Sequence, residues 1–277
     1  MTLSIQKVQR AGGPQVRATN HRARLVISPD DAVENSPFLL LVEDWFAPPA
    51  GFPTHPHRGM ETVTFVIDGQ LLHEDHTGTS GMLGPGAAQF MTAGGGVMHS
   101  EMPGPQGVHL LQLWLNLPAR LKSTTARYTD LQMKDVHVHR EPGVEARIYA
   151  GQLGQVCVPH GSTWPLTLIE LKLDTGTSFE LPIPAGQRAF AYLLGGDALL
   201  GIGDRSVTAG DLAWLEIPPA DQTSTLKITS QTSLRLLVYA SPIFDEPIAV
   251  GGPFVMNTEE EIIQAFMDLQ TGKFIPT

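Results

Sequence analysis

Residues 63–72 read VTFVIDGQLL, and this stretch decides the fold class. β-Branched and apolar residues fill its first half, Asp68 and Gly69 interrupt the run, and a second apolar pair follows. This order is typical of a strand, a turn and a second strand. Residues 190–200, FAYLLGGDALL, repeat it in the other half of the chain, and residues 84–91 (GPGAAQFM) resemble residues 209–215 (AGDLAWL). We therefore expect two similar β-barrels in tandem.

The rest of the chain of 277 residues follows the same rhythm of short apolar segments between turn-forming residues, which include 28 glycines and 22 prolines. No helical pattern separates these segments, so an all-β protein is favoured over an α/β protein. We predict strands over residues 37–45, 61–67, 108–117, 166–173, 190–194, 212–217 and 234–240.

One short helix is expected near the C-terminus. Thr258 and Glu261 have the spacing of a capping box, in which each side chain satisfies a backbone N–H of the first turn. Apolar residues then recur at helical spacing, at Ile262, Phe266 and Leu269. Gly272 is suited to end the helix. We expect this helix to serve packing rather than chemistry.

The charge balance argues against direct contact with nucleic acids. The chain has 28 acidic and 18 basic side chains, a formal charge of −10, and no run rich in Lys and Arg. Its single cysteine, Cys157, excludes an internal disulfide, and its apolar neighbours predict a buried side chain. No apolar stretch is long enough for a signal core or a bilayer span. We expect a cytoplasmic protein with no membrane partner.

Two pairs of residues carry the strongest chemical signal. His55 and His57 are two residues apart, as are His99 and Glu101, so in strands each pair points to one face. Three imidazoles and a carboxylate make a ligand set that suits iron, manganese, nickel, copper or zinc. The occurrence of both pairs within one predicted barrel indicates a metal site in that barrel.

Other residues with suggestive chemistry lack such a partner pattern. His73, His76, His137 and His139 are not expected to bind the metal. The glycines at residues 94–96 are not followed by the Lys and Ser or Thr of a phosphate loop. We expect these glycines to let the backbone pass close to the metal and to turn His99 inwards.

The motifs around these residues resemble the cupin superfamily and, within it, the pirin family. The resemblance lies in residues 55–63 (HPHRGMETV), in residues 91–101 (MTAGGGVMHSE), and in a tail with EPI at 246–248 and GGPFVMNT at 251–258. It covers nearly the whole chain. Gly94 departs from it, because it replaces the usual proline of the second cupin motif, which should loosen that turn.

The resemblance implies a bicupin with a metal-binding N-terminal barrel over residues 1–140 and a metal-free C-terminal barrel, with the helix, over residues 141–277. It implies His55, His57, His99 and Glu101 as ligands, and Fe2+ as the usual metal. In the second half, Pro182, Pro184 and Arg188 stand where the first has His55, His57 and Glu61, and no histidine follows His160.

One alternative concerns the carboxylate ligand. Many cupins ligate the metal through the glutamate of the first motif, here Glu61, and strand alternation would place Glu61 on the face of His57. The pirin pattern favours Glu101 as the ligand, with Glu61 as a nearby hydrogen-bonding residue.

The function that the resemblance implies is that of an iron-dependent dioxygenase, which opens quercetin-like flavonols with O2 and releases carbon monoxide. A chelating substrate would use open coordination positions, and Glu101 would also accept the substrate proton as the catalytic base. Five residues are expected to shape the pocket: Met60, Phe65, Met91, Val97 and Met98. The alternative is a redox-sensing iron protein that binds a protein partner such as a transcription factor. A purely structural metal is disfavoured, since four ligands leave positions open.

Overall fold

The computed structural model describes residues 1–159 and 161–275, and its strands group into two compact units. The unit called here the N-terminal barrel comprises Gly12–Asp135, Gly161–Thr163 and Phe244–Thr277, and the C-terminal barrel comprises Met1–Ala11, Val136–His160 and Trp164–Ile243. This grouping differs from a single division after residue 140. Each end of the chain belongs to the barrel built mainly by the other half.

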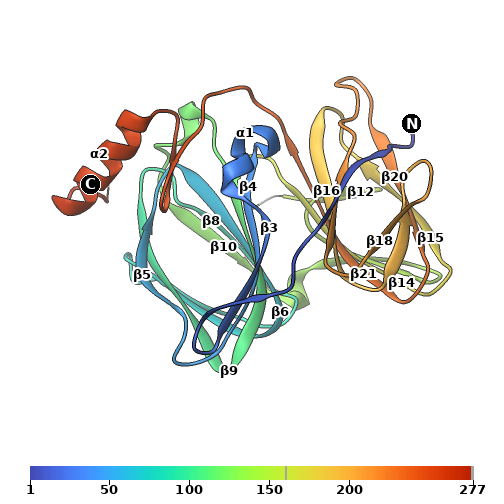
Figure 1. Ribbon diagram of the computed structural model, residues 1–277, viewed down its shortest axis with the longest axis horizontal. Helices are drawn as coiled ribbons and strands as arrows, with labels where there is room; N and C mark the ends of the chain where they lie inside the picture. The colour runs from blue at the N-terminus through green and yellow to red at the C-terminus, as the bar shows by residue number, and fades with distance from the viewer. Residues whose placement is uncertain (160, 276–277) are drawn as a thin grey trace. The chain divides into compact units, whose positions relative to one another are not determined.

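The N-terminal barrel contains a nine-stranded antiparallel sheet with the order β10-β8-β6-β9-β4-β3-β2, in which β5 also pairs with β9 and β7 with β6. Its strands are β2 (Gln15–Ala18), β3 (His21–Ile27), β4 (Phe38–Phe46), β5 (Phe52–His57), β6 (Met60–Asp75), β7 (Ser80–Leu83), β8 (Ala88–Thr92), β9 (Val97–Asn116) and β10 (Arg127–Leu131). A short helix, α1 (Ala32–Asn35), precedes β4. Figure 1 shows these strands in blue and green, curved around one interior.

The C-terminal barrel is built from an eight-stranded sheet of order β1-β19-β16-β21-β14-β12-β11, with β13 paired to β12, and a four-stranded sheet of order β15-β20-β17-β18. Its strands are β1 (Ile5–Arg10), β11 (His137–Glu141), β12 (Val144–Leu153), β13 (Val156–Val158), β14 (Thr167–Leu173), β15 (Ser178–Ile183), β16 (Gln187–Gly195), β17 (Asp197–Leu200), β18 (Arg205–Thr208), β19 (Asp211–Leu215), β20 (Ser224–Ser230) and β21 (Leu234–Pro242). All seven predicted strands lie in or overlap strands of the two barrels, and the all-β class is confirmed.

The interior of the C-terminal barrel is a single apolar core. Strand β15 alternates between exposed and buried residues along its length, as a strand with one face on a core should. Leu181 of β15, Ala191 of β16 and Leu226 of β20 are fully buried in this core. Where the N-terminal barrel carries its histidines, this barrel therefore presents packed aliphatic side chains.

The C-terminal segment packs on the N-terminal barrel. It forms a hairpin of β22 (Ala249–Gly251) and β23 (Phe254–Met256) and then helix α2 (Glu259–Gln270), drawn in red in Figure 1. The predicted capping box is confirmed, since the Thr258 side chain accepts from the Glu261 N–H and the Glu261 side chain accepts from the Thr258 N–H. The apolar face of α2 packs beside the hairpin, where Ala265 is fully buried next to Phe254.

The turn predicted at Gly69 is wrong in form, because β6 continues through it as one strand. Its pairing with β9 shifts register on both sides of Asp68 and Gly69, which bends the two strands together. Gly69 has φ +76°, and a Cβ there would lie 2.2 Å from the carbonyl oxygen of Gly107. Only glycine fits this bend. The bend carries β6 and β9 from the barrel body towards the histidines.

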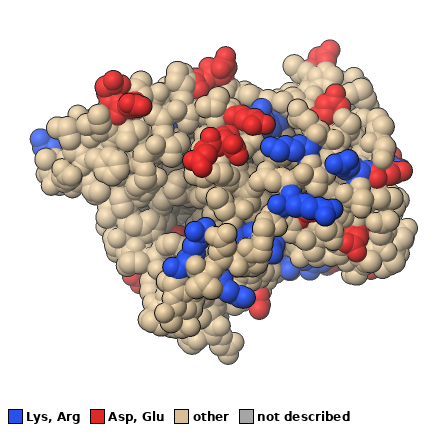
Figure 2. All heavy atoms as spheres, viewed as in Figure 1, with Lys and Arg blue, Asp and Glu red and all other residues tan. Residues whose placement is uncertain are grey.

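Two surface features complete the fold. Cys157 is exposed on the short strand β13, so the prediction of a buried thiol is wrong. Its neighbours Val156 and Val158 supply the apolar character that the sequence shows, while Cys157 points away from the core. On the face shown in Figure 2, acidic and basic side chains are interspersed. Within the described residues, neither helix is long and apolar enough to cross a membrane.

Candidate metal centre

Three histidines meet where β5 and β6 pair with opposite edges of β9. In the β5–β9 pairing His55 is directly opposite His99, and in the β6–β9 pairing His99 is opposite Asp75. One ring nitrogen from each of His55, His57 and His99 lies within 4.8 Å of the others. The ring centroids are 4.3 Å apart for His55 and His99, and 4.9 Å apart for His55 and His57.

Backbone carbonyls orient two of these rings. Nδ1 of His55 donates to the carbonyl oxygen of Pro53 at 2.9 Å, and Nδ1 of His57 donates to that of Pro253 at 3.3 Å. In both neutral rings the proton is thereby on Nδ1, and the Nε2 lone pair is free for a metal. Fixing an imidazole through its outer nitrogen is the usual arrangement around metal-bound histidines.

Burial keeps the rings neutral. Burial is the main cause that lowers the pKa of His57 to about 3, and the neighbouring His55 lowers it further. Burial likewise lowers the pKa of His99, and of the partly exposed His55, below the ordinary value. Uncharged imidazoles are the form that binds metal, so the cluster has the protonation state that a metal site requires.

The unpartnered ring nitrogens of His99 are a second reason why the cluster fits a metal ion. His99 is 1% exposed, yet neither of its ring nitrogens has a hydrogen-bond partner among the described residues. A buried polar atom without a partner costs about 1–3 kcal/mol, so such atoms are rare unless something else binds them. Three imidazole nitrogens with a carboxylate nearby suit a first-row transition metal.

Glu101, the fourth predicted ligand, is buried in the same region but lies outside the three-histidine cluster. Nε2 of Gln112 donates to both of its carboxylate oxygens at 3.0 Å, and Oγ1 of Thr64 donates to Oε1 at 3.4 Å. Burial raises the pKa of Glu101 to about 7, and these donors offset part of that rise. The structure thus unites three of the four predicted ligands and holds the fourth beside them.

Glu61 does not share the face of His57 as strand alternation predicts. Strand β5 ends at His57 and β6 begins at Met60, with Gly59 at φ +78° between them, so the alternation restarts. Oε1 of Glu61 accepts from Oγ1 of Thr92 at 2.5 Å and from the backbone N–H of Thr163 at 2.6 Å. Glu61 therefore fastens residue 163 to the N-terminal barrel.

A cavity of about 270 Å³ borders His55, His57 and Glu101. Its other walls are mostly apolar and come from β4, β5 and β9 and from the tail: Leu40, Val42, Asp44, Phe46, Phe52, Leu110, Gln112, Trp114 and Pro253. The predicted lining of Met60, Phe65, Met91, Val97 and Met98 is wrong. On β6, Thr64 reaches Glu101, so its neighbour Phe65 points to the opposite face of the sheet.

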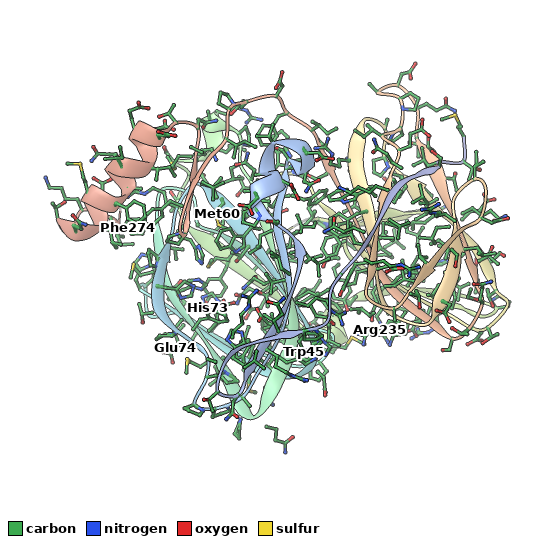
Figure 3. The ribbon with its side chains drawn as sticks, viewed as in Figure 1. Trp45, Met60, His73, Glu74, Arg235 and Phe274 are labelled. Carbon is green, nitrogen blue, oxygen red and sulfur yellow. The ribbon has the colours of Figure 1, made fainter. Side chains whose placement is uncertain are left out.

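His73 is the residue that sequence reasoning missed. Its side chain is fully buried inside the N-terminal barrel (Figure 3), with its ring centroid 5.1 Å from that of His99. Only the register of β6 against β9 brings the two together, and no local motif shows that register. His137 and His139, by contrast, lie on β11 of the C-terminal barrel, away from its core.

Comparison with known proteins agrees with this architecture. The Pirin family model matches residues 25–115, and the Pirin C-terminal cupin domain matches residues 168–275. Pirin-1 of Arabidopsis thaliana is 37% identical over 86% of this chain and 83% of its own length. Human pirin is 33% identical over 99% of this chain and 93% of its own length.

A solved structure shows the same fold over the whole chain. The crystal structure of quercetin 2,3-dioxygenase from Acinetobacter baumannii superposes with a TM-score of 0.87 at 29% identity, and the match covers 99% of each chain. Two family models in the expected order, close relatives over most of their length and a matching bicupin fold all agree. The chain therefore belongs to the pirin family of bicupin proteins.

Proposed function

We propose that His55, His57, His99 and Glu101 hold one divalent transition metal and that the protein is a dioxygenase for quercetin-like flavonols. The proposal adds the adjacent carboxylate of Glu101 to the histidine cluster. One ring nitrogen from each of the three histidines already lies within 4.8 Å of the others. Iron is the favoured metal because the pirin family, to which the chain belongs, is usually found with iron. The same ligands would accept manganese, nickel, copper or zinc.

The cavity is the observation that carries the enzymatic proposal. It opens onto three of the four proposed ligands, His55, His57 and Glu101, and its wall is largely apolar, with Phe46, Phe52 and Trp114 among the lining residues. A flat aromatic substrate would gain from burial against such a wall, while a few polar groups set its orientation. A site that serves structure alone would need no cavity.

The residues around the cavity have separate tasks in this reaction. The metal, when bound, supplies a Lewis acid that lowers the pKa of a coordinating flavonol hydroxyl. Glu101 accepts the proton of that hydroxyl, and the Gln112 amide, which donates to both carboxylate oxygens, holds Glu101 in place to receive it. The apolar walls keep water away from the deprotonated ring.

The direct test is quercetin turnover by protein loaded anaerobically with iron and then exposed to air, followed by the loss of flavonol absorbance. Wild type is expected to turn over in proportion to bound metal, and His99→Ala to lose both metal and turnover. A wild-type protein that binds iron at His99 but leaves quercetin intact would contradict the dioxygenase proposal and favour the redox-sensing alternative.

A further inference from the structure

The outer nitrogen of His99 lacks the partner that the other two histidines have. Carbonyl oxygens of Pro53 and Pro253 accept from Nδ1 of His55 and His57, and no described residue accepts from His99. An imidazole that holds a metal through one nitrogen carries a proton on the other. That proton needs an acceptor in a place from which water is excluded, since His99 is 1% exposed.

His73 stands beside His99 with one unused nitrogen. Its ring is stacked on Tyr128 at 4.9 Å with an interplanar angle of 25°, and its centroid is 5.1 Å from that of His99. Nδ1 of His73 is hydrogen-bonded to Oε1 of Gln89, while Nε2 is buried without a partner. The unused nitrogen of His73 and the unsatisfied ring of His99 are thus neighbours in the same dry interior.

The neighbours of His73 determine which nitrogen carries its proton. Nε2 of Gln89 donates to Oδ1 of Asp130 at 2.8 Å, and a carboxylate can only accept. This bond fixes the Gln89 amide with its carbonyl oxygen towards His73. A carbonyl oxygen also only accepts, so Nδ1 of His73 is the donor. In the neutral ring Nε2 then has a lone pair and no hydrogen.

We propose that His73 is a positioning residue for the metal site, whose Nε2 accepts the outer N–H of His99 when His99 holds a metal. A hydrogen-bonded series of Asp130, Gln89 and His73 would then orient the His99 ring. The carbonyls of Pro53 and Pro253 orient the rings of the other two proposed ligands in the same way. This inference rests on the proposed metal site. It predicts that the series sets the orientation and basicity of one ligand without touching the metal or the substrate.

Replacement of His73 tests the assignment through metal binding rather than activity. His73→Phe keeps a ring against Tyr128 but removes the acceptor, and it should raise the Kd for Co2+ about 10- to 100-fold, the usual cost of losing an outer partner. The visible d–d bands of bound Co2+ should shift as well. His73→Gln places an amide oxygen near the former Nε2 and should restore most of the affinity.

A second variant covers the case in which His73→Phe does not fold. Asp130→Ala frees Gln89 to rotate, so that its amide donates to Nδ1 of His73 and the proton moves to Nε2, where His73 can no longer accept. Asp130 is only partly buried, and the Kd for Co2+ should rise in this variant too. His139→Phe, on the C-terminal barrel, is the matched control and should leave Kd and spectrum unchanged.

The outcomes separate the two proposals. Wild-type protein that does not bind Co2+ would contradict the proposed metal site itself. Wild type that binds, with unchanged Kd and spectrum in folded His73→Phe and in Asp130→Ala, would overturn the role of His73. Equal losses in His73→Phe and His73→Gln would also overturn it, because the acceptor would then not be the feature that matters.

Discussion

The carbonyl oxygen of Pro253 accepts a hydrogen bond from Nδ1 of His57 at 3.3 Å, so the C-terminal segment orients a proposed ligand that precedes it by 196 residues. Arg58, which follows His57 in the sequence, also binds the C-terminal segment. Its Nη1 contacts Oδ2 of Asp268 at 2.6 Å, its Nη2 donates to the Phe274 carbonyl at 2.7 Å, and its guanidinium lies 4.5 Å from the centroid of the Phe274 ring. The tail is therefore part of the proposed metal site.

Arg58→Met should loosen the tail and weaken metal binding. The variant removes the ion pair and both hydrogen bonds, so Pro253 would hold His57 less firmly, and we expect the Kd for Co2+ to rise about 10-fold. The free energy of unfolding should fall by about 1–3 kcal/mol. Arg140→Met removes the exposed pair of Arg140 with Glu145 and should change neither value. Unchanged Kd in Arg58→Met would show that the tail does not support the site.

Two matched substitutions test whether Glu101 or Glu61 is the carboxylate ligand of the metal. Glu101→Gln should lower kcat for quercetin by about 10²- to 10⁴-fold, because it removes the proposed base, and should weaken metal binding. Glu61→Gln keeps an oxygen that can accept from Thr92 and Thr163, so its metal content should equal that of wild type. Metal analysis of both proteins decides the matter. Loss of metal in Glu61→Gln alone would make Glu61 the carboxylate ligand.

Val42→Trp tests whether the cavity holds the substrate. Val42 lines the cavity and pairs with Gln112 across β4 and β9, so an indole there would occupy the space proposed for the flavonol ring. We expect kcat/KM for quercetin to fall by at least about 10-fold, with the Kd for Co2+ unchanged. Val33→Trp, at a position 81% exposed, is the control for added bulk. Full activity in Val42→Trp would place the substrate elsewhere.

Much of the site could be predicted from the sequence because the proposed ligands form two pairs, and the members of each pair are two residues apart within one strand. The spacing of His55 and His57 on β5, and of His99 and Glu101 on β9, follows from the two-residue period of a strand. That His55 is directly opposite His99 depends on the register between strands, which no local pattern specifies. The same register hides His73 from sequence reasoning, since it becomes a neighbour of His99 only through the pairing of β6 with β9.

The sequence also does not show that each end of the chain belongs to the barrel built mainly by the other half, and the reason is different. Strand β1 reads IQKVQR and shows little apolar alternation, yet it pairs with β19 and extends the sheet of the C-terminal barrel. Its pairing uses backbone groups, which every sequence supplies. The predicted cavity walls are wrong because the prediction relies on residues that are near the motifs in sequence. Strand β4 and residues 110–114 of β9 provide much of the wall.

Lys122→Met should change how stability depends on pH. The Nζ of Lys122 donates to the carbonyls of Gly59 and Val255 and to Oδ1 of Asn116 at 2.7–3.0 Å. Burial lowers the pKa of Lys122 from 10.5 to about 7, while Glu246 and Glu261 act to raise it. Between these two pKa values the unfolded chain binds more protons than the folded chain, so this group makes stability rise with pH.

Urea unfolding of wild type and Lys122→Met at about pH 7 and about pH 9.5 measures this effect. The stability of wild type relative to the variant should increase with pH, by at most about 1.4 kcal/mol per pH unit. Other titrating groups are common to both proteins and cancel in the difference. A constant difference across this range would mean that Lys122 stays charged in the folded protein.

The most direct test of the central claim is the fate of labelled dioxygen. Protein loaded with one equivalent of Fe2+ is given quercetin under 18O2, and carbon monoxide and the organic product are both analysed. We predict one carbon monoxide per flavonol consumed and both labelled atoms in the ring-opened product, with neither formed by His99→Ala. Flavonol loss without carbon monoxide, or at equal rate in His99→Ala, would contradict a dioxygenase built on the histidine cluster.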